Sequence, residues 1–546
     1  MTPKFDCKTS VSLEALASNA SLIGAIDQGT SSTRFLLFTD RGEIAASAQM
    51  EHTQIFPPEH VGWHEHNPYE IWNNTVHCMH SAISAARSKL EGDIDIDIDV
   101  KAIGITNQRE TTIAWNAATG KPYYNAIVWD DLRTTSIAED IAAGDKNRLR
   151  EKTGLPLASY FAGTKVRWLL DNVAELRDDL KDETKRDQVR FGTVDSWLVY
   201  QLTGSPKSER GNVGGLFITD VSNASRWLLM DLRTMQWDEE LIDQVCGGSG
   251  LSVPLSALPE IRPSSAVYGK CSSNFGVGPL SGVPIAGILG DQQAALFGQG
   301  AFEPGEAKNT YGTGLFLMMN TGEQMMPSEH GLLTTVGYKL GDNGKTVYAL
   351  EGSVSHSGST IQWLRDQLQI IRDAAESEIL ASKVTSNDGL YFVPAFAGLF
   401  APHWRSDARA CIVGMTASHN RNHIARAALE ACAYQTRDVF DAMYKDSKVE
   451  LKELRVDGGG TANRLLMQFQ SDIINVPVVI PVVKETTSLG AAFVAGLAVG
   501  VWKDLGELKA LWKEEVTFQP LMNDDERNKN WSGWERAIDF LIGNKK

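Results

Sequence analysis

The stretch Ala25-Ile26-Asp27-Gln28-Gly29-Thr30-Ser31-Ser32-Thr33-Arg34 decides the fold prediction for this chain. Apolar runs precede it at 22–26 and follow it at 35–38, so the pattern predicts a β-hairpin with a turn rich in glycine and hydroxyl residues. The turn offers one carboxylate, one glycine that lets the backbone approach a ligand, four consecutive hydroxyl residues and one cation. These groups can hold a phosphate and its metal ion, although an ordinary surface hairpin would have the same pattern. It is not a Walker loop, because no Gly-Lys-Ser/Thr closes it.

The composition limits the class of protein. A chain of 546 residues predicts two or more domains. The net charge of −16, from 52 basic and 68 acidic residues, argues against a nucleic-acid binder. The six cysteines are widely spaced without a Cys-x-x-Cys pair, which is typical of a reduced cytoplasmic protein. The first 21 residues lack a signal-peptide pattern and no apolar run is long enough to span a bilayer, so we expect a cytoplasmic protein without a transmembrane segment.

Two further predicted strands end in polar residues. The buried strand Ala102–Thr106 leads into Asn107-Gln108-Arg109-Glu110-Thr111-Thr112. Arg109 and Glu110 could hold a polyhydroxy ligand, or they could form a surface ion pair. The buried strand Pro284–Leu289 leads into Asp291. Ligands bind at the carboxyl ends of strands in α/β sheets, so this carboxylate suits a general base, or alternatively a helix N-cap.

The second half of the chain contains an echo of the opening hairpin. Asn309–Gly314 is a Gly/Thr turn after a strand, and it is a weak sign of an internal repeat. A change of composition near 300–305 predicts a domain boundary. The short strand Leu454–Val456 opens into Asp457–Asn463, whose three glycines let a flat ligand or its phosphates lie on bare backbone. Leu489–Gly496 predicts a helix of small residues that is suited to close packing.

Four histidines lie close together in the sequence, at His64, His66, His77 and His80. The His-x-His and His-x-x-His spacings occur in metal sites, but no third ligand is evident beside them. Solvent-exposed or core histidines are therefore the expected interpretation.

Taken together, these motifs resemble the FGGY carbohydrate kinases and, within that family, the members that act on glycerol. The motif at 107–112 separates those members from the pentulose kinases. The matching stretches follow the family's order from about residue 22 to about residue 535, so the resemblance covers nearly the whole chain. They are Ala25–Arg34, Gly104–Thr112, Tyr123–Trp129, Ser159–Leu169, Thr193–Trp197, Gly290–Gly298, Lys308–Gly314, Glu351–Trp363, Val393–Trp404, Arg455–Asn463 and Thr486–Gly496.

The resemblance implies an α/β fold with two actin/hexokinase-like (ribonuclease H-like) domains around a central cleft. We expect an N-terminal domain at 1–300 with the glycerol pocket, the catalytic aspartate and a first phosphate loop formed by the hairpin turn within Ala25–Arg34. We expect a C-terminal domain at 301–546 with the adenosine site and a second phosphate loop formed by the turn Asn309–Gly314. The implied reaction is in-line phosphoryl transfer from ATP, with Mg²⁺, to glycerol, which gives sn-glycerol 3-phosphate. A homodimer or homotetramer is expected.

The residue roles of the family carry over by position. Asp291 would take the proton from the attacking hydroxyl, in a reaction that depends mainly on positioning and charge neutralisation. Asp27 would help to hold Mg²⁺ through a water molecule. The glycerol pocket would consist of Arg109, Glu110, Trp129, Tyr160, Asp291, Gln292 and Phe316. The nucleotide would contact Thr30, Ser31, Ser32, Arg34, Thr313, Gly358, Gln362, Gly459 and Asn463, with Asp457–Gly460 as the adenosine-binding turn.

Three stretches depart from the family pattern. Phe275–Ser281 has no arginine where bacterial members have a Gly-Gly-Thr-Arg loop for fructose 1,6-bisphosphate, so inhibition by that sugar phosphate is not expected. Asp130-Asp131-Leu132-Arg133-Thr134 looks closer to the eukaryotic members. His403 and Arg405 stand where the second signature usually has a tyrosine and an acidic residue.

Two other functions fit parts of the same pattern. One is a kinase of this family that acts on another polyol or a ketose, but Arg109 and Glu110 together with Trp129 and Phe316 favour a small pocket. The other is a non-catalytic nucleotide switch of the actin type, which the presence of Asp291 and the polyol-binding set disfavours.

Overall fold

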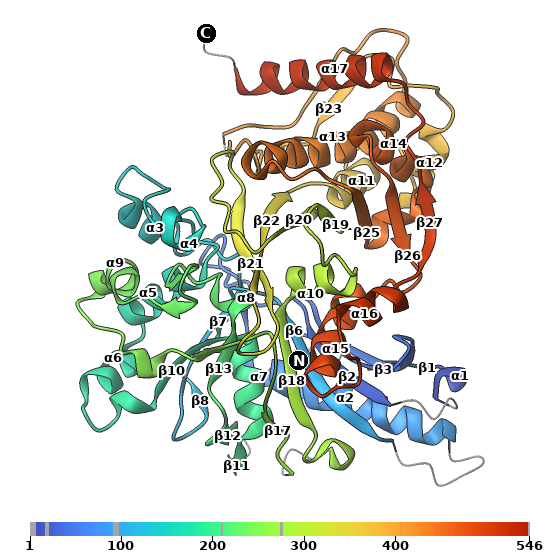
Figure 1. Ribbon diagram of the computed structural model, residues 1–546. Helices are drawn as coiled ribbons and strands as arrows, with labels where there is room; N and C mark the ends of the chain where they lie inside the picture. Colours follow the sequence, from blue (N-terminus) through green and yellow to red (C-terminus); the bar gives the residue numbers. More distant parts are fainter. Residues whose placement is uncertain are drawn as a thin grey trace. The chain divides into compact units, whose positions relative to one another are not determined.

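The computed structural model describes residues 7–16, 21–90, 98–208, 211–273, 277–405 and 407–543 (Figure 1). Phe275 and Gly276, in the loop that lacks an arginine, lie outside the described residues. The chain divides into two compact units. Unit 1 comprises Met1–Gly300, Thr335–Tyr348 and Glu485–Leu511, and unit 2 comprises Ala301–Thr334, Ala349–Lys484 and Trp512–Lys546.

The main sheet of unit 1 is built around the opening hairpin. Among the described residues it has seven strands in the order β1-β4-β3-β2-β6-β18-β17. β2 and β3 pair antiparallel, as the sequence predicts, and β6 pairs parallel with both β2 and β18. The strands are β1 (Lys8–Val11), β2 (Leu22–Gln28), β3 (Ser32–Thr39), β4 (Ile44–Glu51), β6 (Val100–Asn107), β17 (Ser265–Lys270) and β18 (Pro284–Gly290).

A smaller sheet in unit 1 follows the motif at 107–112. In the part of the chain that the structure describes, its strands run in the order β10-β7-β9-β5, and β8 pairs with β7. They are β5 (Glu65–His66), β7 (Thr112–Asn116), β8 (Lys121–Pro122), β9 (Ala126–Ile127) and β10 (Val189–Thr193).

The second seven-stranded sheet, most of whose strands belong to unit 2, repeats the design of the first. Its described strands run in the order β21-β22-β20-β19-β25-β26-β27. The hairpin of β19 and β20 is antiparallel, β25 pairs parallel with β19 and with β26, and β27 closes the edge antiparallel. The echo at 309–314 therefore reflects a repeated fold. The strands are β19 (Glu306–Tyr311), β20 (Leu315–Gly322), β21 (Leu333–Lys339), β22 (Thr346–Val354), β25 (Glu453–Asp457), β26 (Val478–Pro481) and β27 (Glu514–Phe518).

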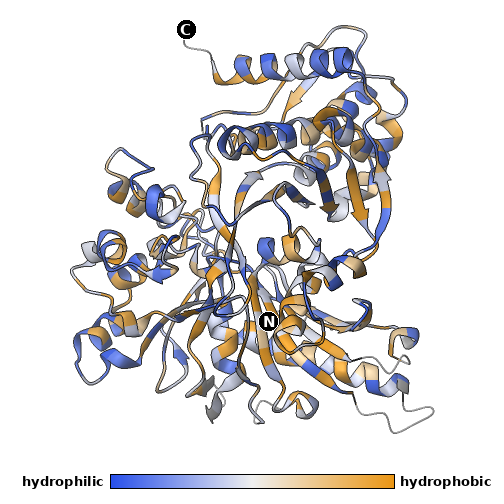
Figure 2. Cartoon of the chain, viewed as in Figure 1, coloured by the Kyte–Doolittle hydropathy of each residue, from blue (hydrophilic) through white to orange (hydrophobic). Residues whose placement is uncertain are grey.

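Helices cover the sheets, and apolar residues are concentrated on the central strands (Figure 2). The longer helices of unit 1 are α2 (Pro68–Leu90), α3 (Thr135–Ala142), α5 (Ala162–Asn172), α6 (Ala174–Lys181), α7 (Val194–Thr203), α9 (Glu239–Cys246), α10 (Asp291–Gly298) and α15 (Thr486–Ala498). Those of unit 2 are α11 (Gly358–Asp366), α12 (Ala374–Ala381), α13 (Arg421–Ser447), α14 (Arg464–Ile474) and α17 (Asp524–Ile542). Among the helices that the structure describes, none combines the length and the apolarity that a membrane crossing requires.

The small-residue helix α15 packs against the backbone of unit 1, as its composition predicts. A Cβ atom added at Gly104 on β6 would lie 2.0 Å from the carbonyl oxygen of Ala491. One added at Gly490 would lie 1.9 Å from the carbonyl oxygen of Ala294 on α10. Only glycine allows these approaches, so the spacing of small residues fixes how α15 sits on the sheet.

We predict that Gly490→Ala destabilises the protein by about 3 kcal/mol or more, because the new methyl group meets backbone that cannot move aside. The gain in helix propensity, about 1 kcal/mol, is smaller than this cost. Chemical denaturation measures the difference. Gly278→Ala is the matched control, since a Cβ there has no heavy atom within 4 Å. Equal stability of the two variants would contradict the packing argument.

Candidate functional site

The candidate site of unit 1 lies where three parallel strands end together. The register pairs Asp27 of β2 with Thr106 of β6, and Asn107 of β6 with Gly290 of β18. The residues that follow these strands therefore meet at one edge of the sheet, where α/β proteins bind ligands. Three of the predicted residues, Asp27, Arg109 and Asp291, are brought together in this way.

Asp291 is the first residue of α10, and Gly290 is the N-cap, so the alternative that Asp291 itself caps the helix is wrong. Its Oδ1 accepts a hydrogen bond of 2.7 Å from the backbone N–H of Gln292 and lies 3.2 Å from Nε of Arg109. Its Oδ2 accepts a bond of 3.1 Å from the side-chain amide of Gln292. Arg109 also donates to Oε1 of Gln293 at 3.2 Å. The carboxylate is one-third exposed, at 34%, so a ligand can reach it.

Glu110 occupies a strained and buried position. The backbone N–H of Thr111 donates to the carbonyl of Arg109 at 2.7 Å, which closes a tight turn in which Glu110 has a φ of 59°. A non-glycine residue rarely adopts this conformation, and such strain is found mainly at functional sites. Arg109 and Glu110 are 3% and 2% exposed, so the alternative of a surface ion pair is wrong. Arg226, fully buried, donates to Oε1 of Glu110 at 2.5 Å.

Two aromatic side chains of the predicted pocket meet edge to face. The ring centroids of Trp129 and Tyr160 are 5.5 Å apart at 90°. The guanidinium of Arg226 lies 5.4 Å from the centre of the Tyr160 ring. The buried Lys165 donates to the carbonyl of Tyr160 at 2.7 Å. Burial lowers the pKa of Lys165 to about 8, while Glu110 opposes that shift.

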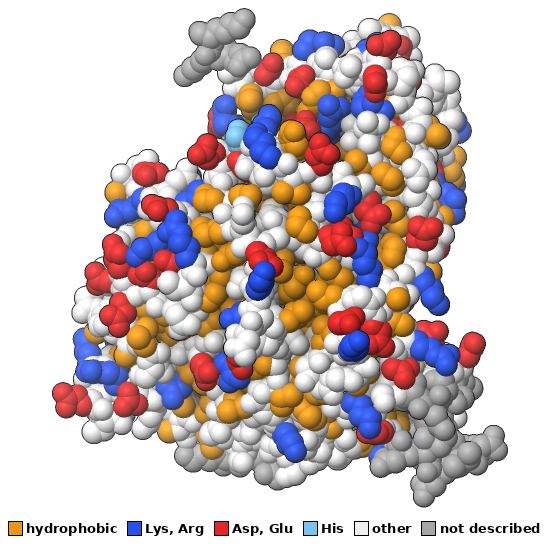
Figure 3. Space-filling model, viewed as in Figure 1, with side chains coloured by type: hydrophobic (Ala, Val, Ile, Leu, Met, Phe, Trp, Pro, Cys, Tyr) orange, Lys and Arg blue, Asp and Glu red, His pale blue; other side chains and the backbone are white. Residues whose placement is uncertain are grey.

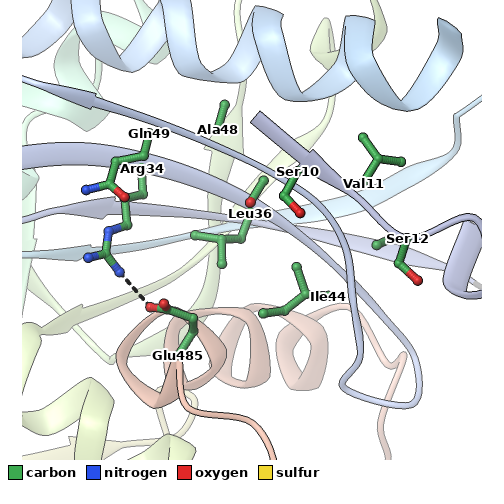
Figure 4. A pocket seen from close by; sticks show the side chains of 11 residues that line it. Ser10, Val11, Ser12, Arg34, Leu36, Ile44, Ala48, Gln49 and Glu485 are labelled. Carbon is green, nitrogen blue, oxygen red and sulfur yellow. Dashed lines mark hydrogen bonds and ion pairs between the residues drawn. The ribbon is translucent and has the colours of Figure 1, made fainter. Parts of the chain in front are cut away.

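The predicted first phosphate loop turns its hydroxyls in different directions. Ser31 is exposed, whereas Ser32 is buried and its Oγ accepts a hydrogen bond of 3.1 Å from Gln49. Thr30 Oγ1 accepts a bond of 2.9 Å from the indole N–H of Trp129. Arg34 forms an ion pair of 2.6 Å with Glu485, at the edge of a cavity of about 290 Å³ (Figure 4). This pair holds the Arg34 guanidinium beside the loop.

The carboxylate of Asp27 fits a role beside a cation. Burial raises the pKa of Asp27 above its usual value, Arg34 and the hydroxyl of Ser488 oppose this shift, and the carboxylates of Glu485 and Asp291 add to it. Ser488 donates to Oδ2 of Asp27 at 2.8 Å. In the described residues no three His, Cys, Asp or Glu side chains are grouped to hold a metal ion. A Mg²⁺ ion held beside Asp27 would take its remaining ligands from phosphate and water oxygens.

In unit 2, the second hairpin holds the start of α11. The carbonyl of Thr313 accepts hydrogen bonds from the backbone N–H groups of Ser357, at 2.9 Å, and Ser359, at 3.1 Å. The N–H of Gly358 donates to the carbonyl of Gly312 at 3.1 Å. The predicted nucleotide residues Thr313 and Gly358 thus lie together, and Gln362 is exposed one turn further along α11.

The glycine turn of unit 2 lies next to the same hairpin, because β19 and β25 pair in parallel. Gly458 has a φ of 88°, and a Cβ there would lie 2.5 Å from the carbonyl oxygen of Tyr311. A Cβ at Gly459 would meet no heavy atom within 4 Å, so this glycine faces open space. Asn463 is the N-cap of α14 and its Oδ1 accepts from the N–H of Leu466 at 2.9 Å.

Phe316, the predicted pocket residue of unit 2, is half-buried on β20. Its carbonyl accepts a hydrogen bond of 3.0 Å from Lys308.

On the face drawn in Figure 3, the Lys and Arg side chains of the described residues alternate with Asp and Glu and do not form one continuous positive surface.

The sequence patterns did not identify four residues that support the site of unit 1: Lys165, Arg226, Glu485 and Ser488. They reach it from distant parts of the chain, so no local spacing indicates the contacts. One signal was available, because Arg226 is the single cation in the mostly apolar run 221–230. A buried cation requires an anionic partner, but the sequence does not indicate which of the 68 acidic residues supplies it.

We predict that Glu110→Ala lowers the free energy of unfolding by about 3–5 kcal/mol, because it leaves the buried guanidinium of Arg226 without its carboxylate. Denaturation curves measure the loss. Glu175→Ala is the matched control, since Glu175 pairs with Lys121 at 3.1 Å on the surface and should change stability by less than about 1 kcal/mol. A loss at Glu110 no larger than that at Glu175 would contradict this assignment.

Comparison with known proteins shows the family of this chain. The model of the FGGY family of carbohydrate kinases, N-terminal domain, matches residues 22–298, and the model of the C-terminal domain matches residues 307–499. A glycerol kinase of Brucella anthropi is 53% identical over 522 residues, which cover 95% of this chain and 99% of that protein. A glycerol kinase of Renibacterium salmoninarum is 54% identical over 515 residues, which cover 94% of this chain and 96% of that protein.

Solved structures agree with this match. The crystal structure of Plasmodium falciparum glycerol kinase with ADP superposes with a TM-score of 0.88 at 40% identity, covering 96% of this chain and 98% of that chain. The expected two-domain fold of the actin/hexokinase type is confirmed. The chain belongs to the FGGY family of carbohydrate kinases.

Proposed function

We propose that this chain catalyses the ATP-dependent phosphorylation of glycerol to sn-glycerol 3-phosphate. The observation that carries the proposal is the buried Arg109–Glu110 pair, placed at a strand end beside Asp291. It stands in a chain that is 53% identical over nearly its whole length to a glycerol kinase. The proposed activity is that of a transferase that uses ATP.

The residues of the proposed glycerol site in unit 1 suit a small polyol. Glu110 and Asp291 supply hydroxyl acceptors, and Arg109 supplies donors in a fixed fork. The amide of Gln292 can turn from Asp291 to a hydroxyl, since both are partly exposed. The faces of Trp129 and Tyr160 offer apolar surface to carbon atoms, and we propose that Phe316 does the same.

Asp291 is the proposed general base. Its Oδ1 accepts a hydrogen bond from the backbone N–H of Gln292 and lies close to Arg109. Among the bonds described above, Oδ2 accepts only the longer one, which comes from the movable side-chain amide of Gln292. A glycerol hydroxyl that donates to Oδ2 would give up its proton there as the phosphoryl group is transferred. Most of the rate enhancement comes from positioning the hydroxyl in line with the phosphate.

The nucleotide sites are proposed from both hairpins. Thr30, Ser31, Ser32 and Arg34 of the first, and Thr313 of the second, are assigned to the phosphates. Gly358 and Gln362 lie beside the second hairpin, and the open turn at Gly459, followed by Asn463, is assigned to the adenosine. Asp27 would hold a water ligand of Mg²⁺, and that ion would supply neutralisation of the phosphate charge.

The proposal divides the roles between residues 1–300, with the glycerol pocket and the general base, and residues 301–546, with the adenosine site. Location in the cytoplasm and assembly as a homodimer or homotetramer stay predictions. A kinase for a larger polyol or a ketose is the second candidate.

The test is ATP consumption by the purified chain with glycerol, erythritol and xylulose in parallel. We expect kcat/KM for glycerol to exceed that for the other two substrates by about 100-fold, because a hydroxyl or methylene that does not fit the pocket costs about 1–3 kcal/mol. A higher kcat/KM with erythritol or xylulose would support the second candidate. ATP consumption that no polyol or ketose stimulates would contradict both.

A further inference from the structure

Thr30, in the first phosphate loop, is held by two side chains. Its hydroxyl accepts from Trp129 Nε1 at 2.9 Å, and its carbonyl accepts from Gln54 Nε2 at 3.0 Å. Trp129 belongs to the proposed glycerol pocket, whereas Gln54 belongs to no motif found in the sequence. The orientation of the Gln54 amide is settled by its partners, since Nε2 also donates to the carbonyl of His52 at 3.1 Å.

The other end of the Gln54 amide faces two histidines. Its Oε1 lies 2.9 Å from Nε2 of His64 and 3.0 Å from Nε2 of His66. An amide oxygen can only accept, so both Nε2 atoms donate to it. The second nitrogen of His66, Nδ1, lies 3.4 Å from the Gln108 amide nitrogen, which is a donor. His66 is therefore neutral. Burial, followed by the neighbouring His52 and His64, lowers the pKa of His66 to about 2.

His64 differs from His66 because its second nitrogen faces a carboxylate. Nδ1 of His64 lies 2.7 Å from Oδ1 of Asp130. Nε2 of His64 therefore donates to Gln54, while its Nδ1 faces the Asp130 carboxylate. The ring of Phe56 stacks on the His64 imidazole, with the two ring centroids 4.4 Å apart.

These contacts close into a ring. Asp130 follows Trp129 in the chain, so the path runs from Thr30 through Gln54, His64 and Asp130 to Trp129, and the Trp129 indole N–H returns it to Thr30. Every link is a hydrogen bond of 3.0 Å or less, or a backbone bond. Networks of this kind fix side chains more firmly than isolated bonds do.

We infer that Gln54 and the His64–Asp130 pair are positioning residues, which lock the Trp129 wall of the polyol pocket to Thr30 of the phosphate loop. The inference rests on the proposed function, because it takes Trp129 to contact the polyol and Thr30 to contact the nucleotide phosphate. A polyol bound against Trp129 then fixes the position of Thr30 through the hydrogen bond between the two residues. In this way the ring couples substrate binding to alignment of the phosphate. Its removal impairs the reaction more than it impairs glycerol binding.

The first test compares Gln54→Leu with Thr53→Val. Thr53 is the next residue along and donates to Glu70 at 3.0 Å, so its variant removes a similar bond outside the ring. We expect Gln54→Leu to lower kcat about tenfold or more, with the KM for glycerol changed less than about threefold, because the phosphate loop is misplaced. Thr53→Val should stay within about twofold of the native kcat.

The second test uses Asp130, whose side chain is 44% exposed and therefore tolerates substitution. Asp130→Ala removes the anchor of His64 and should lower kcat about threefold or more, whereas Asp130→Asn keeps an oxygen that can accept from His64 and should recover most of that loss. The double variant Gln54→Leu/Trp129→Phe should lose less than the product of the two single losses, because both changes act on Thr30.

The melting temperature of each variant separates loss of the fold from loss of the ring. If Gln54→Leu does not fold, the Asp130 pair decides the question. Independent, multiplicative losses in the double variant, or equal kcat for Asp130→Ala and Asp130→Asn, would overturn the inference. If the native chain shows no glycerol-dependent ATP consumption, the proposed function itself is wrong. If the native chain is active but the variants behave as just described, only the inference about the ring is wrong.

Discussion

The parallel pairing of β2, β6 and β18 is the constraint on which the rest of the structure depends. It brings the carboxyl ends of three strands to one edge, so Asp27, Arg109 and Asp291 meet although more than 260 residues separate the first from the last. The pairing needs α15 to cover the sheet at very close range, which the glycines at 104 and 490 allow. Five central strands of the second sheet, β22-β20-β19-β25-β26, follow the same order as β4-β3-β2-β6-β18, so the second hairpin and the glycine turn also meet at strand ends.

Burial of charge gives this edge its chemical character. Glu110 is held in a strained backbone conformation, with Arg226 against its carboxylate. Such a pair contributes little net stability, because desolvation of both ions offsets their attraction. The pair instead fixes where acceptors and donors point. That fixed pattern suits the recognition of hydroxyl groups, which are too small to be distinguished by shape alone.

The sequence predicts the local elements well, because hairpins, strands and helix starts follow from short-range patterns. The opening hairpin, the strand end at Asp291 and the small-residue helix α15 are all confirmed. It does not predict which side chains support them. Arg226 lies 116 residues from Glu110, and Ser488 lies 461 residues from Asp27. The sequence does not indicate the ring around Gln54 for the same reason. The spacing of His64 and His66 also occurs in metal sites, and only the fold places the Gln54 amide between them.

The most direct test of the account is a comparison of native protein and Asp291→Asn in phosphoryl transfer and in nucleotide binding. Asparagine keeps the shape of the side chain but removes the base, so glycerol-dependent turnover should fall by about 1,000-fold or more. ADP binding, measured by calorimetry, should stay within about threefold of the native affinity, since the adenosine site is assigned to unit 2. Turnover close to the native rate in Asp291→Asn would contradict the central claim that the carboxylate at the end of β18 accepts the proton of the attacking hydroxyl.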